Sequence, residues 1–213
     1  MANKINAIMK KKLLFMSLIC AFQFNLNAQL KDVDGNLYPI VKIGNQTWMS
    51  ENLSVSHFKN GEIIPLAKSE LEFEQMGKLK KPGRIIKNGE VQYNWYAVND
   101  NRGLAPLGWH VPHLIEWETL LLYAEDMDKL KSTSGWSYDG NGTNEFGFNA
   151  KAGDGGECSF WWTASEIEMT DPKSPKVFAD VFTLMANLEG ECFISNPFKS
   201  EALCVRCVKD VIE

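Results

Sequence analysis

The sequence predicts an α+β domain of short, twisted antiparallel strands with one main helix and long loops. The chain is rich in ring-bearing and flexible residues, with seven Trp, twelve Phe and sixteen Gly. Its strand-like segments are only five to eight residues long, and a single segment combines length with clear helical spacing of apolar residues. Between residues 131 and 158 the chain is polar and glycine-rich, which predicts a long loop region.

The first strands are predicted to form a hairpin. Residues 37–43 read as a strand, Gly44-Asn45 is a hairpin turn signal, and residues 46–49 read as the return strand. The preceding Asp-Val-Asp-Gly-Asn segment (32–36) faintly resembles a calcium-binding loop. However, Leu37 stands where that loop needs glycine, and no glutamate follows at the twelfth position. We therefore expect a turn there.

Two helices are predicted. Ser69 and Glu72 form a capping box, which starts a helix over about residues 69–80 that ends in a lysine cluster before Pro82. The main helix follows Pro112, a residue suited to the first turn of a helix. Its core-facing positions at helical spacing are Leu114, Trp117, Leu121 and Ala124. The remaining predicted elements are strands over 160–164 and 177–185 and a hairpin over 188–207 that turns near residues 196–198.

The N-terminus has the pattern of a secretory signal peptide. Four lysines and no acidic residue precede an apolar run over residues 13–22, and small and polar residues lead to Ala28. The run is too short to span a membrane, which takes roughly 20 residues. We therefore expect residues 1–28 to be removed and residues 29–213 to form a single domain outside the cytoplasm, in the periplasm, at the cell surface or released.

The charge of the chain argues against nucleic acid and anionic membrane surfaces as partners. After loss of the four leader lysines, 18 basic residues face 27 acidic ones, a formal charge of −9. Such a surface repels phosphate groups, and no basic stripe interleaved with aromatic residues is present. The sequence predicts neither a membrane span nor a cofactor.

Four cysteines remain in the expected mature chain, and an oxidising compartment favours their pairing. Four cysteines allow three connectivities. The predicted 188–207 hairpin places Cys192 opposite Cys204, at a separation that suits a cross-strand disulfide, which leaves Cys158 with Cys207. A zinc site is the competing interpretation, but Cys204-x-x-Cys207 has no second Cys or His pair, so no metal site is predicted.

Eight sequence blocks in order over residues 32–210 resemble the Fibrobacter succinogenes major paralogous domain family. The blocks are Asp-Gly-Asn-x-Tyr (34–38), Ile-Gly-Asn-Gln-x-Trp-Met-x-Glu-Asn-Leu (43–53), Tyr-Asn-Trp-Tyr-Ala-Val-Asn-Asp (93–100), Gly-Leu-Ala-Pro-x-Gly-Trp-His-Val-Pro (103–112), Leu-Lys-Ser-Thr-Ser-Gly-Trp (130–136), Asn-Gly-Thr-Asn-Glu-x-Gly-Phe (141–148), Trp-Trp-Thr-Ala-Ser-Glu (161–166) and Val-Arg-Cys-Val-Lys-Asp (205–210). The resemblance implies a C-type-lectin-like fold in an exported protein of Bacteroidetes or their relatives. It implies no particular activity.

The chain departs from the family pattern at two places. Many members carry a cysteine where this chain has Ala105, and that cysteine would be a partner for the C-terminal one. Cys207 is therefore expected to pair differently or to stay free. Members also usually read Gly-Phe-Ser-Ala-Leu-Pro-Gly-Gly where residues 147–154 read Gly-Phe-Asn-Ala-Lys-Ala-Gly-Asp.

The sequence offers little catalytic chemistry, and no catalytic residue is predicted. The pair His110-x-x-His113 has metal-like spacing, but Pro112 interrupts any shared helical face, so a structural hydrogen bond is the expected role of His110. Residues 108–117 are similar to the start of the main helix in formylglycine-generating enzymes. Those enzymes use a reactive cysteine pair, which suggests Cys204 and Cys207 as an alternative site.

Oxygen-bearing side chains on the long loop are the candidate ligand-binding residues: Asn141, Asn144, Glu145, Asp154 and Glu157. The Glu-Pro-Asn motif of calcium-dependent lectins is absent. The sequence thus favours an exported, non-catalytic recognition or cell-envelope module that binds a protein or glycan through loops 131–158 and 166–176. A formylglycine-generating-like thiol enzyme and a structural envelope component are the alternatives.

Overall fold

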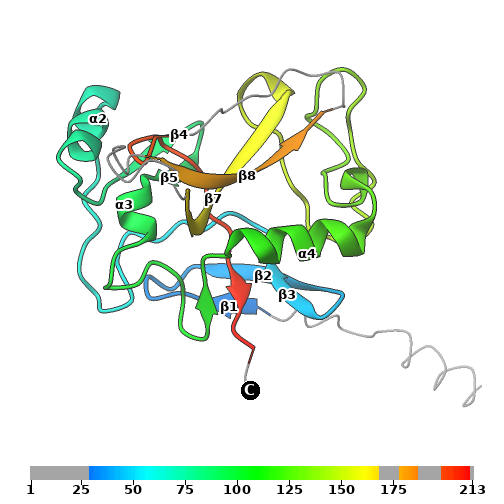
Figure 1. Cartoon of the computed structure of the whole chain (residues 1–213), viewed down its shortest axis with the longest axis horizontal. Coiled ribbons are helices and arrows are strands. Elements are labelled where there is room, and N and C mark those ends of the chain that lie inside the picture. The colour runs from blue at the N-terminus through cyan, green and yellow to red at the C-terminus, as the bar shows by residue number, and fades with distance from the viewer. Residues whose placement is uncertain (1–28, 168–177, 187–197, 212–213) are drawn as a thin grey trace, which may run out of the picture.

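The computed structural model describes residues 29–167, 178–186 and 198–211. The predicted signal peptide and most of the 166–176 loop lie outside these residues. The described chain is an α+β structure with mostly antiparallel sheets and few helices, as expected (Figure 1). This confirms the predicted class at that level.

A five-stranded sheet forms the base of the molecule, in the strand order β1-β2-β3-β9-β6. Its strands are β1 (Gln29–Lys31), β2 (Leu37–Ile43), β3 (Gln46–Met49), β6 (Trp109–His110) and β9 (Val208–Lys209). The predicted β2–β3 hairpin is confirmed, with Gly44 at a positive φ of 59° in its turn. The expected turn before β2 is also present, because the Asp32 side chain accepts hydrogen bonds from the amides of Asp34 and Asn36. Strand β9, close to the C-terminus, pairs with β3 of the β2–β3 hairpin.

The main helix, α4 (Leu114–Ala124), lies between this sheet and a ribbon of two long strands, β7 (Cys158–Glu166) and β8 (Ala179–Met185) (Figure 1). Trp117 on α4 is fully buried and stacks on Phe182 of β8 at 4.2 Å between ring centroids. On its other side it meets Trp48 of β3 at 4.6 Å. Most tryptophans therefore fill the core, which is the default role of such large side chains.

Two shorter helices and a hairpin lie on one side of the α4 layer: α2 (Glu70–Lys78), α3 (Trp95–Val98) and the hairpin of β4 (Arg84–Lys87) and β5 (Glu90–Tyr93) (Figure 1). Two 3-10 helices, η1 (Met127–Lys129) and η2 (Asp154–Gly156), lie in the long loop after α4. The Ser69 hydroxyl caps α2 by accepting from the Glu72 amide at 3.2 Å, so the predicted helix is confirmed. The β4–β5 hairpin was not predicted. Its turn is Asn88-Gly89, with φ of 50° and 80°, the preferred pair for a two-residue turn of this kind.

The described part of the predicted 188–207 hairpin pairs with two other strands. Leu203 forms an antiparallel bridge with Tyr93 of β5, and Cys204 a parallel bridge with Trp161 of β7. Residues 198–207 therefore join the β4–β5 hairpin to the β7–β8 ribbon. The predicted turn near Asn196-Pro197 lies outside the described residues.

The two predicted disulfide pairings, Cys192–Cys204 and Cys158–Cys207, are wrong. Cys204 and Cys207 are free thiols, and Cys158 is disulfide-bonded. The prediction placed Cys204 on a hairpin arm facing Cys192, whereas its bridge partner is Trp161. Cys207 is fully buried in the same apolar cluster as Ala105, where the family pattern would provide a cysteine, and it accordingly stays free.

The long loop between α4 and β7 is present, but its first half is anchored in the core. The Lys131 ammonium, only 2% exposed, donates to the carbonyls of Met185 and Ala186 and pairs with Asp128 at 2.7 Å. The Trp136 indole is buried and donates to a backbone carbonyl within the loop at 3.1 Å. Residues 131–150 are thus part of the folded framework.

Candidate functional site

A cleft of about 750 Å³ opens beside the start of β7. It is lined by the β4–β5 hairpin and by residues of the segments 151–160 and 202–204, which we call its walls, and by Asn52, which we call its floor. The side chains that line it include Asn52, Asn88, Glu90, Gln92, Lys151, Asp154, Glu157, Phe160 and Cys204. The volume falls within the range of small-ligand sites, roughly 300–1,000 Å³.

The floor of the cleft is a fixed polar network around Asn52. Its side-chain oxygen accepts from the Trp161 indole at 2.8 Å and from the Arg206 guanidinium at 3.2 and 3.4 Å. These donors orient the amide, because only its oxygen can accept hydrogen bonds. The Asn52 amide nitrogen therefore points the other way and donates to Glu90 at 3.3 Å.

Arg206 is a buried cation behind this floor, with 1% of its surface exposed. Its guanidinium donates to the Phe148 carbonyl at 2.6 Å and lies over the Phe148 ring, 4.3 Å from the centroid. Among the described residues no carboxylate pairs with it directly. Burial lowers its pKa to about 10, a value at which the group is still charged at neutral pH.

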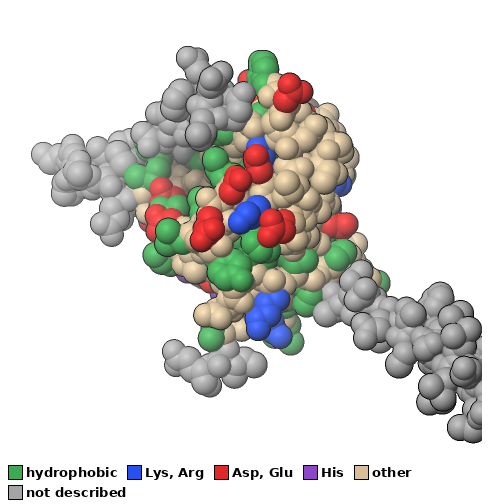
Figure 2. Space-filling model, turned by 90° about the vertical axis from the view of Figure 1, so that its right-hand side faces the viewer, with side chains coloured by type: hydrophobic (Ala, Val, Ile, Leu, Met, Phe, Trp, Pro, Cys, Tyr) green, Lys and Arg blue, Asp and Glu red, His purple; other side chains and the backbone are tan. Residues whose placement is uncertain are grey.

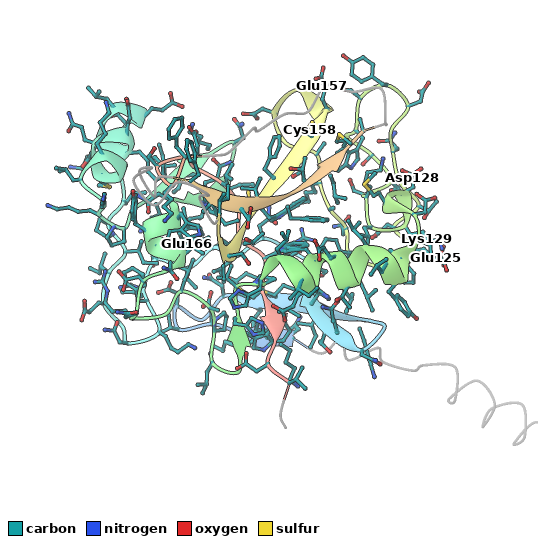
Figure 3. The ribbon with its side chains drawn as sticks, viewed as in Figure 1. Glu125, Asp128, Lys129, Glu157, Cys158 and Glu166 are labelled. Carbon is teal, nitrogen blue, oxygen red and sulfur yellow. The ribbon has the colours of Figure 1, made fainter. Side chains whose placement is uncertain are left out.

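Asn88, Asp154 and Glu157, which we call the rim of the cleft, form side-chain hydrogen bonds. The Asn88 amide in the β4–β5 turn donates to the Asp154 carboxylate. The Tyr138 hydroxyl donates to Glu157 at 2.7 Å, which raises the pKa of the tyrosine. Figure 3 shows Glu157 and Cys158 at the start of β7. The rim thus joins a hairpin turn to the second half of the long loop.

The structure brings together two of the five predicted ligand-binding residues, Asp154 and Glu157, which both line the cleft. The other three do not line it. The Asn141 side-chain oxygen accepts from the Trp136 amide at 3.0 Å, and the Asn144 oxygen accepts from the Asn149 amide at 2.7 Å. Both close turns inside the loop, as Asn often does, and Glu145 is exposed away from the cleft.

A comparison with models of protein families shows which family the chain belongs to. The model of the Fibrobacter succinogenes major domain matches residues 41–209. The chain belongs to this family. Comparisons with curated proteins and with solved structures found no match. The predicted family is thereby confirmed, and the Asn52–Arg206 contact joins the two ends of the major domain.

Sequence reasoning missed the main residues of the cleft in this major domain. Asn52 and Arg206 are 154 positions apart, and each alone looks like an ordinary residue of a sequence block. Glu90 and Gln92 belong to the hairpin that was not predicted. Its Asn-Gly turn between apolar residues was the available signal.

Two free thiols, Cys204 and Cys207, lie within the described part of the major domain. Cys204 lines the cleft, but burial raises its pKa to about 12, and the nearby Glu90 charge acts in the same direction. Burial also raises the pKa of Cys207 well above its ordinary value. The thiolate is the reactive form of cysteine, and the raised pKa of each group disfavours it.

His110 connects three elements of the framework. Its Nε2 lies 2.8 Å from Glu116 of α4, and its Nδ1 lies 2.7 Å from Asp210 after β9. The hydrogen bond to Glu116 raises the pKa of His110, partly offset by burial and assisted by Asp210. Both ring nitrogens lie within hydrogen-bond distance of a carboxylate, so the ring links β6 to α4 and to the segment after β9.

In residues 29–167, 178–186 and 198–211 no group of three or more His, Cys, Asp or Glu side chains has a geometry that could hold a metal ion. None of the helices described there is long and apolar enough to cross a membrane. Acidic and basic side chains are mixed on the face seen in Figure 2.

Proposed function

We propose that this major domain is an exported recognition module that binds a cell-envelope protein or glycan in the cleft over Asn52, without catalysing a reaction. The observation that carries the proposal is the cleft itself, a ligand-sized hollow with a rigid polar floor and hydrogen-bonded rim. A few fixed polar groups in a concave site are typical of specific binding. Such preorganisation lowers the cost of ordering the site around a ligand.

The chemistry of the described residues supports binding over catalysis. Cys204 is the thiol in the cleft, and its raised pKa leaves very little thiolate at neutral pH. This disfavours the formylglycine-generating-like alternative. His110, the residue best suited to proton transfer by its ordinary pKa, has both nitrogens bound to carboxylates outside the cleft.

A C-type-lectin-like fold belongs to the same proposal. The arrangement that supports it is a main helix packed between an antiparallel sheet and a long ribbon, with extended loops around the ribbon. The last strand also pairs with the first hairpin, so the two ends of the domain meet. We propose that this framework presents the 151–160 segment as the variable part of the cleft.

Filling the cleft tests the proposal. Lys151 is exposed and lines the cleft, so Lys151→Trp adds a large ring at its mouth without changing a buried residue. Lys68→Trp is the matched control, because Lys68 is also exposed but does not line the cleft. The exported wild-type protein and both variants are compared for binding to a glycan array and to envelope proteins of the source organism.

The proposal expects at least one partner that wild type and Lys68→Trp bind and Lys151→Trp loses. If both variants retain every partner, the cleft is not the binding site. If wild type binds nothing in either panel, the structural envelope alternative is preferred. Export is tested separately, by N-terminal sequencing of the protein recovered outside the cytoplasm, which is expected to begin at Gln29.

Labelling with a thiol reagent tests the catalytic alternative. In the native protein, Cys204 and Cys207 are expected to react slowly, because the raised pKa of each thiol disfavours the thiolate and Cys207 is also buried. Both should react fully in denaturant. A Ser134→Cys variant, which places a thiol on an exposed position of the long loop, supplies the rate of an accessible cysteine. Fast native labelling of Cys204 would instead favour a reactive thiol in the cleft.

A further inference from the structure

We infer that the cleft recognises the hydroxyl groups of a neutral sugar, held between the amide of Asn52 and the carboxylate of Glu90. The inference rests on the proposed function and names the ligand class of the same cleft. It begins from the two groups, which lie 3.3 Å apart at the floor of the cleft. One is a donor of fixed direction, and the other is a charged acceptor.

The donor is fixed because its amide oxygen is fully engaged. Trp161 and Arg206 together direct three N–H groups at the Asn52 oxygen, so rotation of the amide would place N–H against N–H. An amide nitrogen carries two hydrogens. One is directed at Glu90, and the second remains for a ligand in the cleft.

The acceptor complements this donor. Among the described residues the Glu90 side chain forms a hydrogen bond with Asn52 alone, and a carboxylate can accept about four. A ligand hydroxyl is both donor and acceptor. It can therefore accept from the second Asn52 hydrogen while donating to Glu90, and a hydrogen bond to a carboxylate is about twice as strong as a neutral one.

Other ligand classes fit this pair less well. A phosphate or carboxylate accepts only, so it cannot donate to Glu90. The charged side chains that line the cleft are three carboxylates, Glu90, Asp154 and Glu157, and two lysines, Lys87 and Lys151, of which Lys87 is paired with Glu70. An ammonium group donates only, and it would face the Asn52 hydrogens with the buried Arg206 cation behind them. A hydroxyl group avoids both conflicts, because it is uncharged and can both donate and accept a hydrogen bond.

The buried cation strengthens the donor. Arg206 is hydrogen-bonded to the Asn52 oxygen, and it lies in a site where burial lowers its pKa to about 10. In such a low-dielectric site, successive hydrogen bonds polarise one another. The guanidinium therefore draws electron density from the amide and makes its N–H groups better donors toward the cleft.

The walls provide the apolar contact that a sugar ring also needs. Phe160 lines the cleft and is partly exposed, which leaves ring surface for the C–H face of a pyranose. Gln92 of β5 adds an amide to the lining. The combination of hydroxyl-binding groups and a ring surface matches a polyhydroxylated ring better than it matches an extended peptide.

Two substitutions test the inference while preserving the framework. Asn52→Asp keeps oxygen acceptors for Trp161 and Arg206 but removes both amide hydrogens. Glu90→Gln keeps the shape of the side chain and removes its charge. Glu118→Gln is the matched control, since Glu118 is exposed on α4, away from the cleft. Thermal unfolding of each variant shows whether the fold is retained.

The probes are neutral oligosaccharides of glucose, galactose, mannose and N-acetylglucosamine, with sulfated and sialylated counterparts. We expect the exported wild-type protein to bind at least one neutral sugar and to prefer it over its anionic form. Asn52→Asp and Glu90→Gln should each weaken this binding by about tenfold or more, and Glu118→Gln should not change it.

The outcomes separate the inference from the proposed function. If no neutral sugar binds, or if anionic sugars are preferred, the inference fails, while a partner lost in Lys151→Trp would still support the cleft as a binding site. If a neutral sugar binds equally to wild type, Asn52→Asp and Glu90→Gln, the Asn52–Glu90 pair is not its site. If that sugar also binds Lys151→Trp with unchanged affinity, the proposal that the cleft is the binding site is contradicted as well.

Discussion

The two halves of the long loop before β7 have similar compositions and opposite roles. In residues 131–150, which we call the inward half, two buried side chains, Lys131 and Trp136, donate to backbone carbonyls. In residues 151–160 the side chains of Asp154 and Glu157 line the cleft and lie on its rim. The difference shows that an abundance of Asn, Asp and Gly marks a loop but does not distinguish turn-closing residues from ligand-facing ones.

The difference also explains where this family member can vary. The inward half contains Trp136 and Phe148, both buried, and it follows the family pattern through residue 148. The departure from that pattern includes Lys151 and Asp154, two lining residues of the cleft. Changes there alter the rim and leave Asn52 and Arg206 on the floor untouched.

Truncating the anchor of the inward half is expected to have the largest effect. Trp136→Ala removes a buried indole and its hydrogen bonds to Ser132 and Ala150. It should lower the free energy of unfolding by about 3–5 kcal/mol, measured by urea denaturation. The control is Tyr138→Ala, an exposed ring two residues later, which should change stability much less. Equal small losses would show that residues 131–150 are not part of the framework.

A paired substitution compares the two halves directly. Asn141→Ala leaves the Trp136 amide without its acceptor and should cost about 1–3 kcal/mol of stability, with ligand binding unchanged in the protein that remains folded. Asp154→Ala removes an exposed rim carboxylate and should change binding with less than about 1 kcal/mol in stability. Unfolding in urea and titration with the partner found for wild type supply the two measurements. A reversal of this pattern would overturn the assignment of roles.

The sequence was a good guide to local structure and a poor guide to contacts between distant segments. Gly44-Asn45 and the Ser69 cap act within a few residues, so their hairpin and helix were predictable. The position of Cys204 depends on its pairing with Trp161 of β7, and which segments pair with each other depends on the whole fold. The floor of the cleft, which needs Asn52 and Arg206 together, was unpredictable for the same reason.

Among the candidate residues, chemistry alone could not separate the roles. Asn141 and Asp154 both read as oxygen ligands on a polar loop. The structure distinguishes them because one oxygen faces a backbone amide within the loop and the other faces the β4–β5 turn across the cleft. Backbone direction decides this, and single-sequence patterns do not encode it.

His110 provides a smaller test of an inward-facing polar group. Its pKa is raised above 6.5 mainly by the hydrogen bond to Glu116, with Asp210 adding to it. The folded protein therefore holds the proton to higher pH than the unfolded chain does. The resulting stabilisation is fully present below about pH 6.5 and is lost as the pH rises through the raised pKa.

Comparing wild type with His110→Gln in urea between about pH 5 and pH 9 measures this contribution. The stability difference should decrease by about 1 kcal/mol across that range, since the ring is partly exposed and solvent screens both pairs. Asp210→Asn should remove part of the same pH dependence, because Asp210 is the second carboxylate on the ring. A difference that stays constant with pH would mean that His110 holds the framework without a charge.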